Sequence, residues 1–268
     1  MGKITDKVRD FIGATEEETI YAISESNFIP EGVQVILENH VSDLAAEVIG
    51  GLLAGALPRI NGIRLNYKEK RFERNVRGAM IEFNNRLEFM DERMAQLDSH
   101  VEEKFRELYV EWLLDSLENE KQGTKVPYFV NGYIAMMNNM TNDDLMIMFF
   151  STLNDLTDLD IDVLKMYHYA SEVNIYTLID EKHLTYEQID LVKEKLLRNG
   201  LLESKNDEQR DANLDEVVRY ISELAKQMKV TKPKEVKAAK TKKISRSESY
   251  KITLLGRNYL EMIGALKG

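Results

Sequence analysis

The sequence predicts a mainly α-helical protein, in which a helical N-terminal body with a long coiled-coil-like helix precedes a C-terminal winged-helix domain with a small β-hairpin. Three observations predict this fold. The 268 residues include only 4 prolines and 14 glycines, so few residues break a helix. Apolar residues recur at helical spacing between residues 76 and 112. Toward the C-terminus, segments typical of helix, helix, strand, strand and helix follow one another. We expect domains over residues 1–156 and 157–268.

The composition excludes several classes of function. The 46 acidic and 36 basic side chains give a net charge of −10, which argues against a general affinity for nucleic acid or anionic membranes. The absence of cysteine excludes disulfides, thiolate metal sites and cysteine nucleophiles. The 4 histidines share no ligand spacing, and no glycine-rich phosphate loop occurs. We therefore expect no metal, no cofactor, no catalytic residues and a non-enzymatic role.

One apolar segment near the N-terminus has two interpretations. Residues 44–57 read LAAEVIGGLLAGAL, which is shorter than the roughly 20 apolar residues of a spanning helix and contains Glu47. The segment is either a buried helix or a conditional membrane contact, aided by the cations that follow it. Its candidate membrane-facing residues are Val48, Ile49, Leu52, Leu53 and Leu57. We expect a cytoplasmic protein, with the inner face of the membrane as the alternative site, because no signal-peptide pattern opens the chain.

The strongest periodic signal predicts a long helix over residues 66–121. Its apolar residues alternate at intervals of 4 and 3, the spacing of a coiled-coil seam. The seam consists of Val76, Met80, Phe83, Leu87, Met90, Met94, Leu97 and Val101. With Met80 at an a position, Arg86 and Asp91 have the g-to-e′ spacing that joins two parallel helices. Two interpretations stay open: the seam packs inside its own chain, or it forms a homo-oligomer.

Two further helices complete the expected N-terminal body. Pro127 favours the first turn of a helix that continues through Met137. Asp143 and Asp144 then open the sequence LMIMFFSTL, which is apolar on nearly every face. We expect this second helix to lie at the centre of the core.

The C-terminal part has the order of a winged helix. Thr185 and Gln188 form a capping box at the start of a helix that Gly200 ends. Residues 201–203 and 249–253 are then expected to pair as the two strands of the wing. Between them lies an insertion over residues 205–248, which holds one predicted helix over residues 214–228 and a basic stretch. The sequence LLGRNYLEMIGAL forms the closing helix.

The basic stretch suits contact with an anionic surface. Residues 226–246 contain nine cations and a single carboxylate, that of Glu235. Such a stretch binds phosphates of nucleic acid or lipid, or else lies as a solvated tip against the acidic body. The residues expected to bind an anionic surface are Lys237, Lys240, Lys242, Lys243 and Arg246. No aromatic residue interrupts the stretch, and the preceding helix exposes Glu187, Asp190 and Glu194, so any nucleic-acid binding should be weak and non-specific.

Residues 100–265 carry three short motifs that resemble a known family. They are a Leu-Tyr pair followed by a Leu-Leu pair and a serine, a Pro-x-Phe-Val turn, and a C-terminal Tyr-x-Ile-Thr-x-x-Gly segment. The matching residues are Leu108, Tyr109, Leu113, Leu114, Ser116, Pro127, Phe129, Val130, Tyr250, Ile252, Thr253 and Gly256. The chain thereby resembles the abortive-infection alpha family of bacteria and their prophages. The resemblance implies an antiviral defence role in stopping phage multiplication, and this family supplies no catalytic residues.

The leading expectation for function is therefore a non-enzymatic phage-defence protein that acts through protein–protein or conditional membrane association. Its expected partners are further copies of the chain and a phage protein. A winged-helix transcriptional regulator that binds DNA is the first alternative. An oligomeric scaffold protein assembled through residues 76–112 is the second.

Overall fold

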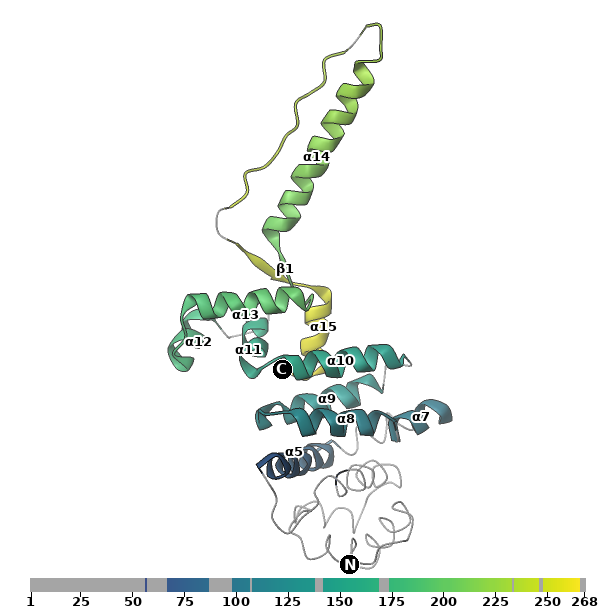
Figure 1. Cartoon of the computed structure of the whole chain (residues 1–268), viewed down its shortest axis with the longest axis vertical. Helices are drawn as coiled ribbons and strands as arrows, with labels where there is room; N and C mark the ends of the chain where they lie inside the picture. Colours follow the sequence, from purple (N-terminus) through teal and green to yellow (C-terminus); the bar gives the residue numbers. More distant parts are fainter. Residues whose placement is uncertain are drawn as a thin grey trace, which may run out of the picture. The chain divides into compact units, whose positions relative to one another are not determined.

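The computed structural model describes residues 56, 67–86, 98–106, 108–137, 142–168, 174–232, 234–245 and 248–265. Within this part the protein is mainly helical and contains one two-stranded antiparallel sheet (Figure 1). The predicted mainly α class with a small antiparallel sheet is confirmed. The chain forms two compact units, one comprising Met1–Ile161 with Leu260–Gly268 and the other Asp162–Tyr259.

The first unit is organised around α8, which packs against its neighbours α5, α7, α9 and α10. The elements of this unit are α5 (Tyr67–Asn84), α7 (Ser99–Arg106), α8 (Leu108–Asn119), the 3₁₀ turn η2 (Gly123–Lys125), α9 (Val126–Met136) and α10 (Asp143–Asp155). Four rings meet edge to face at its centre, with centroids 4.7–5.5 Å apart, those of Phe83, Phe105, Tyr109 and Tyr133. The Tyr133 hydroxyl donates to the Phe105 carbonyl, which satisfies the one polar group of that buried ring.

The long helix expected over residues 66–121 is divided, so its predicted continuity is wrong. α5 ends at Asn84, and Asn85 and Arg86 lie in a turn. α7 begins after Asp98, whose carboxylate accepts hydrogen bonds from the backbone N–H groups of His100 and Val101 at 3.1 and 3.0 Å. Such a cap satisfies N–H groups that a continuing helix would bond internally, and so it starts a new helix.

The described part of the predicted seam is buried within its own chain. Val76, Met80 and Phe83 of α5 are fully covered, and Val101 of α7 is 9% exposed. α5 packs against α8 and α9, so the intramolecular interpretation accounts for these four side chains. The remaining seam residues lie outside the described residues, as do those of the candidate membrane segment; they are Leu87, Met90, Met94, Leu97, Val48, Ile49, Leu52, Leu53 and Leu57.

α10 has one buried side and one exposed side, contrary to the expectation that it lies at the centre of the core. Met146, Phe149, Phe150 and Leu153 are buried. The opposite face is 40–50% exposed and carries Leu145, Ile147 and Met148. The sequence LMIMFFSTL is nearly all apolar, so its composition alone could not distinguish the covered face from the exposed one.

The second unit contains the small sheet. Its elements are α12 (Ile175–Lys182), α13 (Tyr186–Arg198), β1 (Leu202–Ser204), α14 (Lys205–Gln227) and β2 (Tyr250–Ile252), while α11 (Asp158–Lys165) and α15 (Leu254–Met262) cross its boundaries. The predicted capping box at Thr185 and Gln188 is confirmed. The predicted strand pairing is confirmed as well, with Leu202 opposite Ile252 and Ser204 opposite Tyr250.

A close backbone approach fixes the junction between β2 and α15. The Thr253 hydroxyl donates to the Gly200 carbonyl at 2.8 Å and accepts the N–H of Gly256 at 2.9 Å, so it caps α15. A Cβ atom at residue 256 would overlap the carbonyl oxygen of Leu201. Glycine at this position therefore allows α15 to start directly against the chain that enters β1.

α14 starts earlier than the helix predicted over residues 214–228. Ser204, the last residue of β1, accepts hydrogen bonds from the N–H groups of Asn206 and Asp207 at 3.1 and 3.2 Å. This cap and the acidic first turn allow the helix to begin at Lys205. We call residues 205–249 the extension: it comprises α14 and a returning segment, residues 228–249, which leads back to β2 (Figure 1).

Candidate interaction surface on the extension

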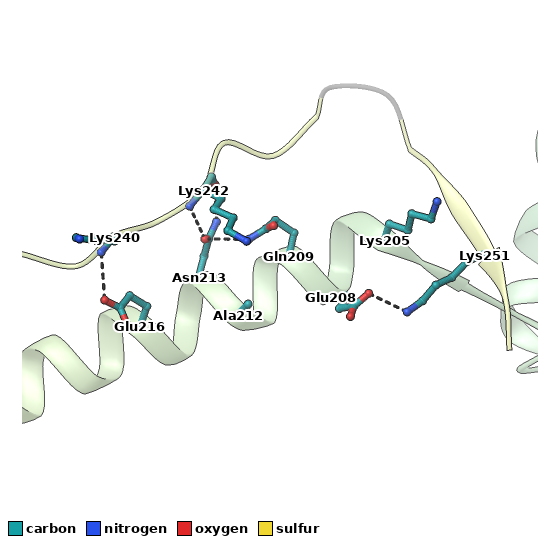
Figure 2. A pocket seen from close by; sticks show the side chains of 9 residues that line it. All are labelled: Lys205, Glu208, Gln209, Ala212, Asn213, Glu216, Lys240, Lys242 and Lys251. Carbon is teal, nitrogen blue, oxygen red and sulfur yellow. Dashed lines mark hydrogen bonds and ion pairs between the residues drawn. The ribbon is translucent and has the colours of Figure 1, made fainter. Parts of the chain in front are cut away.

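The returning segment lies along one side of α14, to which its backbone is hydrogen-bonded. The N–H of Lys240 donates to the Glu216 carboxylate at 3.2 Å. The Asn213 amide bonds both ways with Lys242, accepting from its N–H at 2.7 Å and donating to its carbonyl at 2.8 Å (Figure 2). These contacts give backbone groups of the irregular segment partners that a strand or helix would otherwise supply.

The same side of α14 holds the segment at both ends. Near the tip, the Gln227 side chain accepts from the N–H of Lys234 at 2.8 Å. Near the sheet, the Asn206 amide donates to the carbonyl of Ser245 at 3.3 Å. A shallow groove runs between helix and segment, and its lining residues are Lys205, Glu208, Gln209, Ala212, Asn213, Glu216, Lys240, Lys242 and Lys251 (Figure 2).

Glu216 stays ionised over the whole physiological range. Hydrogen bonds from the Arg219 guanidinium, the nearer at 2.6 Å, are the main reason that the pKa of Glu216 is lowered to about 2. The backbone N–H of Lys240 lowers the same pKa further. The carboxylate is therefore a permanent acceptor that anchors the returning segment.

The described lysines expected to bind an anionic surface are exposed to solvent, and two of them, Lys240 and Lys242, also line the groove (Figure 2). Lys237, Lys240, Lys242 and Lys243 are exposed, while Arg246 lies outside the described residues. Lys240 and Lys242 contact α14 through their backbone groups, so these contacts do not use their ammonium groups. Among the described residues, no carboxylate forms an ion pair with these four side chains. The segment thus lies against its own helix and presents a row of exposed cations.

The side of α14 away from the returning segment carries an exposed apolar stripe, which was not among the predicted interaction surfaces. Its members recur at intervals of 4, 3, 4 and 3 residues, and they are Leu214, Val218, Ile221 and Ala225 of the helix and Met228, its C-cap residue. The exposed fractions of the four larger side chains are 61%, 53%, 58% and 87%. The signal was present in the sequence, because this spacing equals that of the seam at residues 76–101. A stripe this long on an uncovered helix marks a contact surface.

α13 presents acidic side chains to solvent, as expected from its sequence. Glu187, Asp190 and Glu194 are exposed. Lys193 is partly neutralised, since its ammonium group lies 2.8 Å from the Asp190 carboxylate. Gln188 is used by the capping box, where its side chain accepts from the N–H of Thr185 at 2.9 Å. This face would repel the phosphates of DNA.

Within the described residues no group of three or more His, Asp or Glu side chains is placed to hold a metal ion. In the same part of the chain, no helix combines the length and apolar character needed to cross a bilayer. Comparison with protein-family models, curated proteins and solved structures found no match.

Proposed function

We propose that this protein is a non-enzymatic interaction protein that binds another protein chain through the extension of a winged-helix-like domain. The exposed apolar stripe on α14 is the observation that carries this proposal. Burying Leu214, Val218, Ile221 and Met228 against a partner helix would remove a large apolar area from water, at about 25 cal/mol per Å². A helix that lays such a face into a complementary groove or beside a second helix is a common mode of protein recognition.

The winged-helix assignment rests on the order of the elements. α12, α13, β1, β2 and α15 follow the order helix, helix, strand, strand, helix, and the extension occupies the place of the wing. In a DNA reader α13 would enter the major groove, where its exposed Glu187, Asp190 and Glu194 are unfavourable. The acidic α13 supports a winged helix that contacts protein.

We further propose phage defence as the process in which this contact is used. The support is the resemblance to the abortive-infection alpha family. Several matching residues have structural roles: Tyr109 and Phe129 are buried, Thr253 caps α15, and Gly256 permits a close backbone approach. The residues of these motifs stabilise the fold and do not form an active site. This supports a protein that acts by binding another protein chain.

A phage challenge tests the proposal in cells. Cells that produce the protein should plaque a sensitive phage less efficiently than cells without it. The double variant Val218→Gln/Ile221→Gln should lose at least about tenfold of that protection at equal protein level, because two central stripe residues no longer favour burial. The matched control is Glu223→Gln/Lys226→Gln, which changes two polar positions of the same helix and leaves the net charge unaltered.

Two outcomes would contradict the proposal. Absence of protection against a broad phage panel would remove phage defence as the process. Full protection by Val218→Gln/Ile221→Gln would show that the stripe is not the contact surface.

A further inference from the structure

We infer that the partner of the α14 stripe is α14 of a second copy of this chain, paired in the antiparallel direction. This inference rests on the proposed use of the extension as a protein-contact surface and names its partner. The first support is the spacing. Intervals of 4, 3, 4 and 3 residues keep the five stripe side chains on one seam, with Leu214, Ile221 and Met228 at d positions and Val218 and Ala225 at a positions. The 23 residues of α14 extend over about 34 Å, long enough for such a seam.

The returning segment leaves this seam open. The side chains that hold it, Asn206, Asn213, Glu216 and Gln227, all occupy c and f positions of the same heptad pattern. Positions c and f lie on the side of a helix away from a and d. One side of α14 is therefore used within the chain, while the other is free for a second helix.

The flanking charges select the antiparallel direction. In an antiparallel pair, e positions of one helix face e positions of the other. The e positions here are Asp215 and Ser222 of α14 and Lys229, which lies in the turn that directly follows the helix. Centring the pair on Ser222 brings Asp215 opposite Lys229 of the partner subunit, and the twofold symmetry repeats this contact. The two opposite charges thus meet twice, at the two ends of the seam. Both side chains are exposed and so are available for this contact.

The apolar side chains fit the same register. It sets Ile221 opposite Ala225 of the partner subunit, so that a large residue lies beside a small one across the centre. Leu224, at a g position, meets Leu224 of the partner subunit, which extends the apolar contact on the second flank. In a parallel pair the e positions would instead face g. Asp215 would then face Arg210 of the partner subunit, whose guanidinium is already ion-paired with Asp207 and Glu248 of its own chain. Lys229 would lie beside Leu224 of the partner subunit without an opposite charge. In the antiparallel arrangement, by contrast, the e positions pair opposite charges and the g positions pair two leucine side chains.

The association state of the full-length protein gives the first test. Light scattering should report a mass of two chains, each of 31.0 kDa, at micromolar concentration. Val218→Gln/Ile221→Gln should raise the dissociation constant by at least about a hundredfold, and Glu223→Gln/Lys226→Gln should leave it unchanged. Circular dichroism of each variant establishes that the fold is intact.

Charge reversal and cross-linking test the direction. Asp215→Lys should weaken the dimer, and adding Lys229→Asp to it should restore the dimer, because each pair then regains opposite charges. The chain has no cysteine, so a single introduced thiol can be cross-linked selectively by a short bis-maleimide. Ser222→Cys should cross-link two copies efficiently, while Asp215→Cys should not. The antiparallel register would be overturned if Ser222→Cys and Asp215→Cys cross-linked equally well. It would also be overturned if Lys229→Asp did not restore the dimer weakened by Asp215→Lys.

The outcomes separate this inference from the proposed function. A folded wild-type protein that stays monomeric overturns self-pairing; if its stripe variants still lose phage protection, the stripe binds a different protein. A dimer that follows the predicted pattern but gives no protection supports self-pairing and rejects phage defence. A dimer of unchanged stability in Val218→Gln/Ile221→Gln places the interface elsewhere and overturns the inference.

Discussion

Single residues decide how closely the helices of the first unit approach one another. Gly132 of α9 faces the ring of Phe149 from α10, and a Cβ atom at this position would overlap that ring. Gly78 of α5 has a different environment, because its Cβ atom would lie 3.4 Å from the Val126 Cγ1 atom, an ordinary van der Waals contact. The two glycines therefore predict opposite effects of the same substitution.

Gly132→Ala should lower the free energy of unfolding by about 1–3 kcal/mol, because the added methyl group forces α9 and α10 apart. Gly78→Ala serves as the control and should raise the free energy of unfolding by about 0.5–1 kcal/mol, since alanine favours the helix interior. Urea denaturation followed by circular dichroism measures both. A neutral Gly132→Ala would mean that Phe149 moves aside without cost.

A buried ion pair connects α8 to the start of α9. The Lys125 ammonium group lies 2.5 Å from the Glu120 carboxylate, and both residues are buried. Glu120 also accepts the N–H of Gln122 at 2.6 Å, so the carboxylate shapes the turn between the two helices. The pair is thus part of a small buried polar network, in which the Asn75 amide also donates to the Glu120 carbonyl at 3.0 Å.

Lys125→Met should lower the free energy of unfolding by about 3–5 kcal/mol, because it leaves the Glu120 carboxylate buried without its counter-ion. Adding Glu120→Gln should recover a large part of that loss, since the amide carries no charge and its oxygen still accepts the N–H of Gln122. Chemical denaturation of the single and double variants measures the coupling. A double variant as unstable as Lys125→Met would contradict this account.

Among the secondary-structure elements, α14 of the extension has two sides with different contacts. The side of α14 that faces the returning segment supplies polar acceptors, and the other side supplies the apolar stripe. Glu216 anchors the segment, and its contribution depends on pH in a predictable direction. A carboxyl whose pKa is lowered on folding stabilises the folded form above its unfolded pKa and loses that contribution as the pH falls through the lower value.

Protection of the Lys240 amide against hydrogen exchange should stay constant from about pH 7 to about pH 5. It should then decrease between the ordinary glutamate pKa of 4.5 and the lowered pKa of about 2, as Glu216 becomes protonated. Glu216→Gln should reduce the protection above about pH 5, because a neutral acceptor forms a weaker hydrogen bond than the ionised carboxylate, and the difference should vanish near pH 2. Glu223→Gln is the matched control and should leave the protection of Lys240 unchanged. Loss of protection already above about pH 5 would rule out Glu216 as the anchor.

At the scale of the whole molecule, charge is distributed unevenly. The chain has a net charge of −10, yet the returning segment presents Lys237, Lys240, Lys242 and Lys243 as an exposed cationic row. Such a row attracts phosphates without reading a sequence, and the acidic remainder of the chain limits the affinity.

Binding to duplex DNA or to anionic vesicles should therefore be weak and should disappear with added salt. Lys242→Gln/Lys243→Gln should reduce the slope of log affinity against log salt concentration by about 2, because two phosphate contacts are lost. Lys70→Gln/Lys121→Gln is the matched control, since it removes two exposed lysines elsewhere. Fluorescence anisotropy on duplexes of different sequence measures the effect, and tight binding to one sequence would revive the DNA-binding regulator.

Several features were predictable because they depend on short stretches of chain. The capping box of Thr185 and Gln188 spans four residues, and the strands at residues 202–204 and 250–252 are marked by apolar alternation beside glycine and threonine. The division of the helix over residues 66–121 was missed, because the apolar spacing continues past the Asp98 cap. The start of α14 was missed because Ser204 can end a strand and cap a helix at once.

The order of residues was sufficient to predict the helical class, the succession of elements in the second unit and the accessible cationic stretch. Which of the two apolar seams is covered depends on the three-dimensional packing. Val76 and Met80 are buried against α8 and α9, whereas Val218 and Ile221, at the same spacing, are exposed. The physical reason is that hydrophobic periodicity depends on one helix alone, while burial depends on what packs against it. Periodicity therefore predicts that a helix has an apolar side, and the three-dimensional arrangement determines whether that side belongs to the core or to a partner.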